Sequence, residues 1–320
     1  MCTASKMERN CGGNWGVDTA NRRHNCNMKK QATAIQAQVI PRTSDIGDMQ
    51  VKRALPSRDV RSVGSFVFWD QMGPGELLEG SGIDVRPHPH IGLATLTYLF
   101  SGHIQHRDSL GSDMVIGPLA ANLMVSGSGI VHSERSDAIS RASRSELFGI
   151  QSWLALPTSL EETDAEFLPY SAAQIPTWDD DGIEGRVVMG RHDGLCSPVQ
   201  FPAETLYLDV QMAAGSRFVV PAELAERAVY SLGGDLQVDG IRYPSETLLI
   251  LTPGQTVELS ALYGTRILVF GGEPLDGPRH LWWNFVSSRR DRIEQAKQDW
   301  QAGRFGAVPG ETEWIPLPEA

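Results

Sequence analysis

Short apolar runs, separated by glycine and proline, follow one another along most of this 320-residue chain. Many of them alternate apolar with polar positions and are rich in β-branched residues, which is the pattern of strands that bury one face. A first set comprises residues 51–55, 65–69, 95–100, 113–116, 122–125 and 147–156. A second set comprises residues 186–189, 204–212, 217–220, 228–231, 236–238, 247–251, 256–259 and 265–270. This spacing predicts an all-β fold of two similar units in tandem, each a sandwich or barrel.

A polar segment, residues 158–181, separates the two sets and is rich in Glu and Asp, so we interpret it as an excursion or linker. We divide the chain into a leader of residues 1–35, a first β-unit of residues 36–160 and a second β-unit of residues 161–320. The first 30 residues carry six Lys or Arg and almost no aliphatic residues, so the leader is expected to be disordered. Met28 opens a more ordinary beginning, which favours an upstream-extended start over the alternative of a functional basic tail.

One helix is predicted, at residues 290–301 near the C-terminal end. Ser287 or Ser288 can cap its first turn, and Gly303 can end it. The residues at helical spacing, which are expected to pack on a barrel, are Ile293, Ala296, Lys297 and Trp300. The neighbouring aromatic residues are Trp282, Trp283, Phe285 and Trp314. We interpret these aromatic residues as packing against the helix, with a ligand-binding role as the alternative.

The excess of acidic residues argues against nucleic acid as a binding partner. The chain carries 28 Lys and Arg against 39 Asp and Glu, a net charge of −11, whereas binding to phosphate backbones needs clustered positive charge. We therefore expect no direct contact with nucleic acid. No apolar run approaches the roughly 18 residues of a membrane span, and a secretory signal is not recognisable, so we expect no membrane role and a cytoplasmic location. The four cysteines match no common zinc or disulfide pattern, and Cys196 is interpreted as an inert thiol.

Two short motifs carry the candidate chemistry, His88-Pro89-His90 and His132-Ser133-Glu134. Alternate side chains of a strand share a face and lie roughly 6.5–7 Å apart, close enough for both to reach one ion. Together the motifs offer three imidazoles and one carboxylate to a single transition metal, which leaves two positions of an octahedron for water, substrate or dioxygen. The prolines around the first histidine are tolerated only at the edge or rim of a sheet. The predicted metal ligands are His88, His90, His132 and Glu134.

The histidines outside these two motifs are not predicted to be metal ligands. His106 and His103 are expected either at the surface or beside the ligands, and neither is predicted to bind the metal. His106 is the better candidate for the second role, because it lies in a polar cluster with Arg107 and Asp108 that could orient the ligands. The second β-unit has no histidine between His192 and His280, so a site of three imidazoles cannot be built there. We therefore expect one metal per chain, in the first unit.

The spacing of these motifs resembles a known superfamily. Gly82-(five residues)-His88-x-His90 is similar to the first cupin motif, and Gly129-(two residues)-His132 is similar to the second. A glutamate usually follows the first motif's second histidine by four or five positions, where this chain has Ala94 and Thr95. Glu134 supplies the carboxylate instead. This relocation is typical of the pirin family, whose GxGIxHSE signature residues 127–134 match closely.

Further matches to the pirin family extend over most of the chain. They comprise Thr97-Tyr98-Leu99, residues 106–111 and Gly149-Ile150-Gln151-x-Trp153. The turn at residues 117–122 departs from the family pattern, which leaves the shape of that turn open. The resemblance implies two tandem cupin (jelly-roll) β-barrels with a C-terminal helix, a metal site in the first barrel alone, and a monomer.

The resemblance also implies a cofactor and a function. It implies iron, and the mixed nitrogen and oxygen ligands agree with Fe(II), although Mn, Co, Ni, Cu or Zn also fit. The implied function is that of a quercetin 2,3-dioxygenase, which opens the central ring of a flavonol or related aromatic enol with O₂ and releases carbon monoxide. Glu134 would then be both ligand and base. The alternative is a non-enzymatic redox-sensing regulator that binds a protein partner as a transcriptional or metabolic co-regulator.

Overall fold

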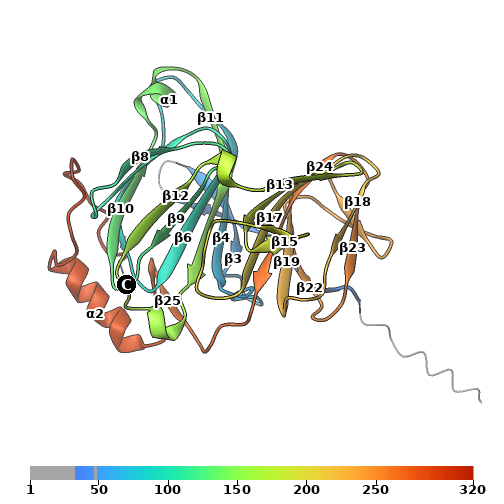
Figure 1. Ribbon diagram of the computed structural model, residues 1–320. Coiled ribbons are helices and arrows are strands. Elements are labelled where there is room, and N and C mark those ends of the chain that lie inside the picture. The colour runs from blue at the N-terminus through green and yellow to red at the C-terminus, as the bar shows by residue number, and fades with distance from the viewer. Residues whose placement is uncertain (1–32, 47–48, 320) are drawn as a thin grey trace, which may run out of the picture. The chain divides into compact units, whose positions relative to one another are not determined.

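The computed structural model describes residues 33–46 and 49–319, and its strands gather into two barrels (Figure 1). Each barrel pairs a seven-stranded sheet with a four-stranded sheet, and all the registered strand pairs are antiparallel. The large sheet of the first barrel has the order β12 (Glu166–Tyr170), β9 (Ala121–Val125), β6 (Leu93–Ser101), β11 (Ser145–Ala155), β4 (Phe66–Leu77), β3 (Gln50–Leu55) and β2 (Arg42–Asp45). Its small sheet has the order β5 (Asp84–His90), β10 (Ile130–Arg135), β7 (Ile104–Asp108) and β8 (Asp113–Ile116).

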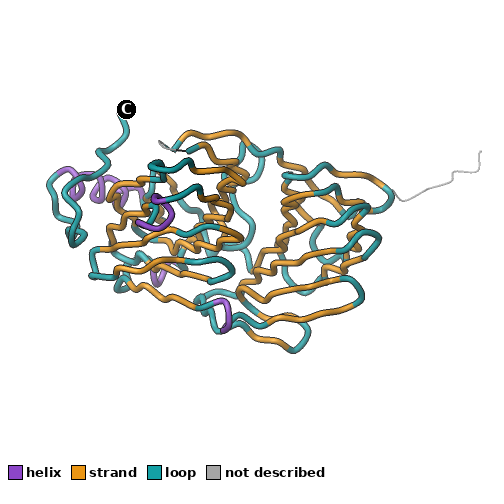
Figure 2. Tube along the Cα trace, turned by 90° about the horizontal axis from the view of Figure 1, so that it is seen from above, coloured by secondary structure: helices purple, strands orange, loops and turns teal. Residues whose placement is uncertain are grey.

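The second barrel repeats this plan, and Figure 2 shows the two groups of strands from above. Its large sheet has the order β1 (Ile35–Val39), β22 (Leu248–Leu251), β19 (Glu226–Gly233), β24 (Thr265–Gly272), β17 (Thr205–Met212), β14 (Ile183–Met189) and β13 (Thr177–Asp180). Its small sheet has the order β18 (Arg217–Val220), β23 (Val257–Ala261), β20 (Leu236–Val238) and β21 (Ile241–Tyr243). The predicted all-β fold of two cupin barrels with a C-terminal helix is therefore confirmed.

The remaining elements are short. They are the hairpins β15 (Arg191–His192) to β16 (Leu195–Cys196) and β25 (His280–Trp282) to β26 (Phe285–Ser287), the helices α1 (Ala138–Ala142) and α2 (Arg290–Gln301), and the 3₁₀ helices Thr158–Leu160 and Ala172–Gln174. Within the described ranges, neither α-helix is long and apolar enough to cross a membrane.

Each end of the described chain joins the barrel that the other end of the sequence forms. β1 pairs with β22 in the second barrel, with Val39 opposite Leu248. At the other end, Phe285 of β26 forms a bridge with Ile91, directly after β5 of the first barrel. The N-terminal strand and the C-terminal segment therefore both link the two barrels. The predicted division between residues 160 and 161 stays a prediction, and the predictions for residues 1–32 fall outside the described residues.

Two local predictions need correction. Residues 158–181 are more than a linker, because β12 and β13 each add an edge strand to a large sheet. Helix α2 has the predicted bounds, but its N-cap is Arg289, without a side-chain cap. The serines before it are occupied elsewhere: the hydroxyls of Ser287 and Ser288 donate to Glu161 Oε2 at 3.0 and 2.9 Å. The buried carboxylate of Glu161 therefore anchors the chain entering the helix.

The main core lies between the two large sheets. Leu96 and Tyr98 of β6 and Trp69 of β4 pack in one cluster with Tyr207 and Phe270 of the second barrel. Trp69 and Phe270 stack with ring centroids 3.9 Å apart. Both faces of β6 are covered, which explains why its sequence is apolar almost without alternation.

A buried polar network crosses the same interface. Tyr98 Oη donates to Asp209 Oδ2 at 2.8 Å, and Arg266 donates to both oxygens of that carboxylate. Tyr230 Oη of the second barrel donates to Gln71 Oε1 of β4 at 2.8 Å. These buried polar groups are paired across the barrels, so the interface is specific as well as apolar.

Candidate metal centre

Three histidines from two neighbouring strands meet inside the first barrel. His88 and His90 lie on β5, and His132 lies on β10 opposite His88. One ring nitrogen from each histidine lies within 4.8 Å of those from the other two. His90 Nε2 and His132 Nε2 are 3.1 Å apart, and all three residues are at most 6% exposed. In the described part of the chain, this is the one cluster of three or more His, Cys, Asp or Glu at such a spacing.

The edge position of β5 accounts for its unusual sequence. β5 pairs with β10 on one side only and forms the edge of the small sheet. Pro87 and Pro89 lack the N–H groups that a central strand would need, so the edge tolerates them. The free carbonyl of Pro87 accepts a hydrogen bond from the backbone N–H of Ile315 at 2.8 Å. The predicted edge location of the first motif is confirmed.

The turn before β10 requires glycine. Gly127 has a φ of +48°, and a Cβ at this position would lie 1.9 Å from the carbonyl oxygen of Thr163. Neither proline nor another residue with a Cβ fits this backbone. The tight contact brings the segment after β11 against the start of the second motif.

Burial keeps the three imidazoles neutral. It lowers the pKa of His88 from 6.5 to about 4, although a hydrogen bond to the carbonyl of Arg86 opposes the change. Burial lowers the pKa of His90 and of His132 well below the usual value, and the neighbouring histidines lower both further. Neutral imidazoles are the protonation state that binds metals. The site is therefore ready to bind a cation at neutral pH.

Glu134 lies two residues beyond His132 on β10 and lines the same cavity as His88 and His90. Its Oε1 accepts a hydrogen bond from Gln151 Nε2 at 3.2 Å, and Gln151 Oε1 accepts one from Thr97 Oγ1 at 2.6 Å. Burial raises the pKa of Glu134, against the opposing effects of His106 and Gln151. The close group of ligand atoms consists of the three histidines without Glu134, so its ligand role stays a prediction.

His106 belongs to the surroundings of the site. It lies on β7 opposite Glu134, and its ring stacks on Phe167 of β12 with centroids 4.1 Å apart. His106 Nε2 is 3.1 Å from Asp108 Oδ2, and His106 Nδ1 is 3.5 Å from His132 Nδ1. His103 is exposed. Of the two roles that the sequence left open for His106, at the surface or beside the ligands, the structure has the second, because His106 lies next to the candidate ligand His132.

A cavity of about 500 Å³ opens beside the histidines. Phe68 of β4 and Trp153 of β11 stack with centroids 3.8 Å apart, and the Trp153 ring meets His90 at 5.2 Å. Arg53 lies over Phe68 at 4.4 Å and forms two hydrogen bonds with Asp70. Sequence reasoning missed these cavity residues because each lies on a different strand from the histidines, and no local spacing marks it. Trp283, which it assigned to aromatic packing, contacts Trp282 and Phe285 and also lines this cavity.

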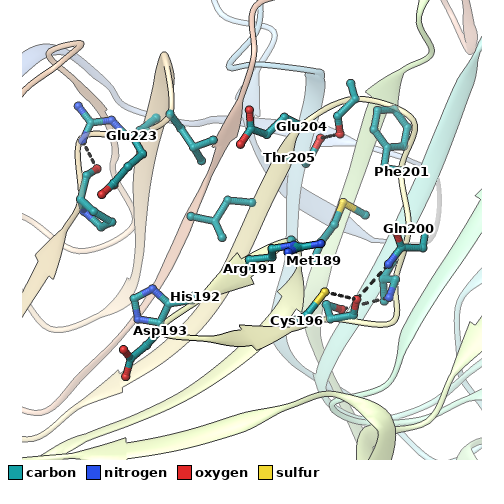
Figure 3. A pocket seen from close by; sticks show the side chains of 18 of the residues that line it. Met189, Arg191, His192, Asp193, Cys196, Gln200, Phe201, Glu204, Thr205 and Glu223 are labelled. Carbon is teal, nitrogen blue, oxygen red and sulfur yellow. Dashed lines mark hydrogen bonds between the residues drawn. The ribbon is translucent and has the colours of Figure 1, made fainter.

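The second barrel has a cavity of about 410 Å³, shown in Figure 3. It contains a single histidine, His192, whose ring packs beside Trp178 at 4.6 Å. The exposed Cys196 lies at its rim and donates to the carbonyl of Ser197. The prediction that the second barrel lacks a site of three imidazoles is consistent with this lining.

Comparison with known proteins identifies the family. The pirin model matches residues 48–154, and the model of the pirin C-terminal cupin domain matches residues 207–306. The chain belongs to the pirin family. A pirin-like protein of Caulobacter vibrioides is 44% identical to this pirin over 87% of the chain and 97% of the relative.

Two solved structures share the fold of this pirin. A quercetin 2,3-dioxygenase from Acinetobacter baumannii has a TM-score of 0.83 and 33% identity, covering 89% of this chain and 95% of that one. The bacterial pirin YhhW from Escherichia coli, solved in complex with nickel(II), has a TM-score of 0.58 and 16% identity, covering 75% of this chain and 99% of that one. The second likeness concerns the fold alone.

The residues of this pirin fit a divalent transition metal. Three neutral imidazoles converge with their Nε2 or Nδ1 atoms in a buried pocket, and thiolates are absent from the cluster. Nitrogen ligands with a carboxylate nearby suit first-row metals, whereas structural zinc sites usually close with thiolates. The histidine cluster is therefore a candidate metal site.

Proposed function

We propose that this pirin is an Fe(II)-dependent dioxygenase of the quercetin 2,3-dioxygenase type, which acts on flavonols or related aromatic enols. The observation that carries the proposal is the half-buried carboxylate of Glu134, with a raised pKa, beside neutral histidines in an aromatic cavity. The name of the Acinetobacter baumannii structure supports the same reaction class.

His88, His90 and His132 would hold the metal, with Glu134 as the fourth ligand. Fe(II) is our first choice, and Mn, Co, Ni, Cu or Zn suit the same donors. A bound redox-active metal would supply electron exchange with dioxygen and would polarise the substrate hydroxyl.

Glu134 is the group that we assign to proton transfer. A carboxylate whose pKa lies above its usual value is a better proton acceptor at neutral pH than an exposed one. Gln151 donates to one carboxylate oxygen and is itself held by Thr97, so the other oxygen can accept the hydroxyl proton of an enol. The histidines must stay neutral to bind metal, which leaves Glu134 as the base.

The cavity suits a flat aromatic substrate. Its volume of about 500 Å³ lies in the range of small-molecule sites. The stacked rings of Phe68 and Trp153 form an apolar wall next to His90. Arg53, already paired with Asp70, places a guanidinium over the Phe68 ring and can face an ionised substrate hydroxyl.

The test is anaerobic loading with Fe(II), followed by oxygen uptake and detection of carbon monoxide with a panel of flavonols. We expect turnover by the wild-type protein, and a loss in Glu134→Gln that is much larger than its loss of bound iron. A fully iron-loaded protein that consumes no oxygen with any flavonol would refute the proposal. Capture of one protein partner in a single oxidation state would then favour the regulator. If Glu134→Gln loses metal and turnover equally, Glu134 is a ligand and not the base.

A further inference from the structure

His106 is a buried histidine that neither the ligand cluster nor the proposed proton transfer uses. It is 2% exposed, lies on β7, and touches two different polar partners through its two ring nitrogens. Nε2 faces the carboxylate of Asp108 at 3.1 Å, and Nδ1 faces Nδ1 of His132 at 3.5 Å. The imidazole therefore links a carboxylate to a predicted metal ligand.

The Asp108 end of this link is held in place. Asp108 is fully buried, and its Oδ1 accepts backbone N–H bonds from Leu110 at 2.9 Å and Ser112 at 3.0 Å. These bonds leave Oδ2 for His106. Burial alone would raise the pKa of Asp108, but the hydrogen bonds from His106 and Ser112 outweigh it and hold that pKa below its usual value. A carboxylate only accepts hydrogen bonds, so His106 Nε2 must carry the proton.

The proton on His106 Nε2 determines which nitrogen of His132 carries a proton. A neutral His106 that is protonated at Nε2 has a bare lone pair at Nδ1, which can only accept. His132 Nδ1 must then carry its own proton and donate it. His132 Nε2 is left with a lone pair, and this atom faces His90 Nε2 at 3.1 Å, where the cluster would hold an ion.

We propose that Asp108 and His106 are positioning residues that fix His132 in the tautomer that binds metal through Nε2. The inference rests on the metal site of the proposed function. Ligand histidines usually donate their second N–H to a carboxylate, carbonyl or water, which sets tautomer and ring orientation. In this pirin the group that accepts from His132 is the imidazole of His106. The carboxylate, Asp108, contacts His106 and not His132 itself. The stack on Phe167 holds the plane of the intermediate ring.

The direct test is long-range ¹H–¹⁵N NMR of the full chain with ¹⁵N-labelled histidine, both metal-free and loaded with Zn(II), which is diamagnetic. We expect His106 to be protonated at Nε2 and His132 at Nδ1 in both forms. Protonation of His106 at Nδ1, or of His132 at Nε2, would overturn the inference. If the wild type takes up no Zn(II), the metal site itself is refuted, and the metal-free spectrum still decides the tautomers.

Asp108→Asn tests the consequence, because an amide can donate to His106 Nε2 and release the constraint on both rings. We expect its Zn(II) affinity to fall about 10- to 100-fold, with a second tautomer of His106 visible by NMR. Asp113→Asn is the matched control: it removes a carboxylate that bonds Gln105 and Arg107 on the same hairpin and is 55% exposed. An Asp108→Asn protein with wild-type affinity and tautomers would contradict the proposal. If that variant fails to fold, His106→Phe, which keeps the stack but removes the acceptor, must show the loss of affinity.

Discussion

The metal-free pirin should lose stability as the pH falls from 6.5 to 4, because its buried His88 resists protonation. Burial lowers the pKa of His88 to about 4 in the folded chain, whereas the unfolded chain keeps the ordinary value of 6.5. Between these two values the unfolded state binds more protons than the folded state. By linkage, the stability that the neutral imidazole contributes is complete above pH 6.5 and is lost as the pH falls toward 4.

The size of the effect follows from the two pKa values. Each tenfold difference in proton affinity corresponds to about 1.4 kcal/mol, so the full change for His88 is about 3 kcal/mol. At pH 5, which lies inside the window, about 2 kcal/mol of this is already lost relative to pH 7. His90 and His132, whose pKa values are also lowered, should add to the loss in the same direction.

The assay is urea unfolding of chelator-treated protein at pH 7 and pH 5, for the wild type and for His88→Gln. Comparing the two proteins removes the contribution of the other titrating groups. We expect the wild type to lose about 2 kcal/mol more than the variant between the two pH values. An equal loss in both proteins would show that His88 titrates normally in the folded state and would refute the reasoning.

Three further predictions concern a hydrogen bond, an ion pair and the packing of the core, and each is measured by urea unfolding at pH 7. Tyr98→Phe should cost about 1 kcal/mol, because it removes one neutral donor while Asp209 keeps its arginine; a cost of zero would contradict this. Glu161→Gln should cost about 3 kcal/mol, since it leaves the buried Arg279 with a weaker partner, whereas an exposed Glu→Gln control should change little. Phe270→Ala should cost about 3–4 kcal/mol by opening a cavity between the barrels, and Phe270→Leu should recover part of it.

Two of the candidate ligands, His88 and His90, could be predicted from sequence because their spacing is local. A strand places residues i and i+2 on one face whatever the rest of the chain does, so His88 and His90 needed no tertiary information. The bounds of α2 were predictable for the same reason, from helical spacing. Its cap was not, because the partner of Ser287 and Ser288 is Glu161, more than 120 residues earlier.

Non-local pairing accounts for what sequence reasoning missed. The strand β1 joins the second barrel through β22, and Phe285 bridges to Ile91 of the first barrel, although the sequence of neither segment indicates its partner. Phe167 stacks on His106, although it belongs to residues 158–181, which the sequence pattern predicts to be an excursion or linker. The pattern of polar and apolar residues around Phe167, in Glu166–Tyr170, is too short to distinguish a strand from a loop.

The second barrel, which lacks the histidine cluster, contributes to the candidate site through a shared wall. On β4, Phe68 and Asp70 face the cavity, whereas Trp69 and Gln71 face the second barrel. On β11, Gln151 faces Glu134, while Ile150 and Leu154 of the same strand pack in the core between the barrels. Successive residues of a strand alternate between faces, so packing on one face fixes the side chains on the other. The second barrel therefore holds Gln151 and the Phe68 ring in place without touching the histidines, which gives a physical reason to keep a cupin barrel that lacks the histidine cluster.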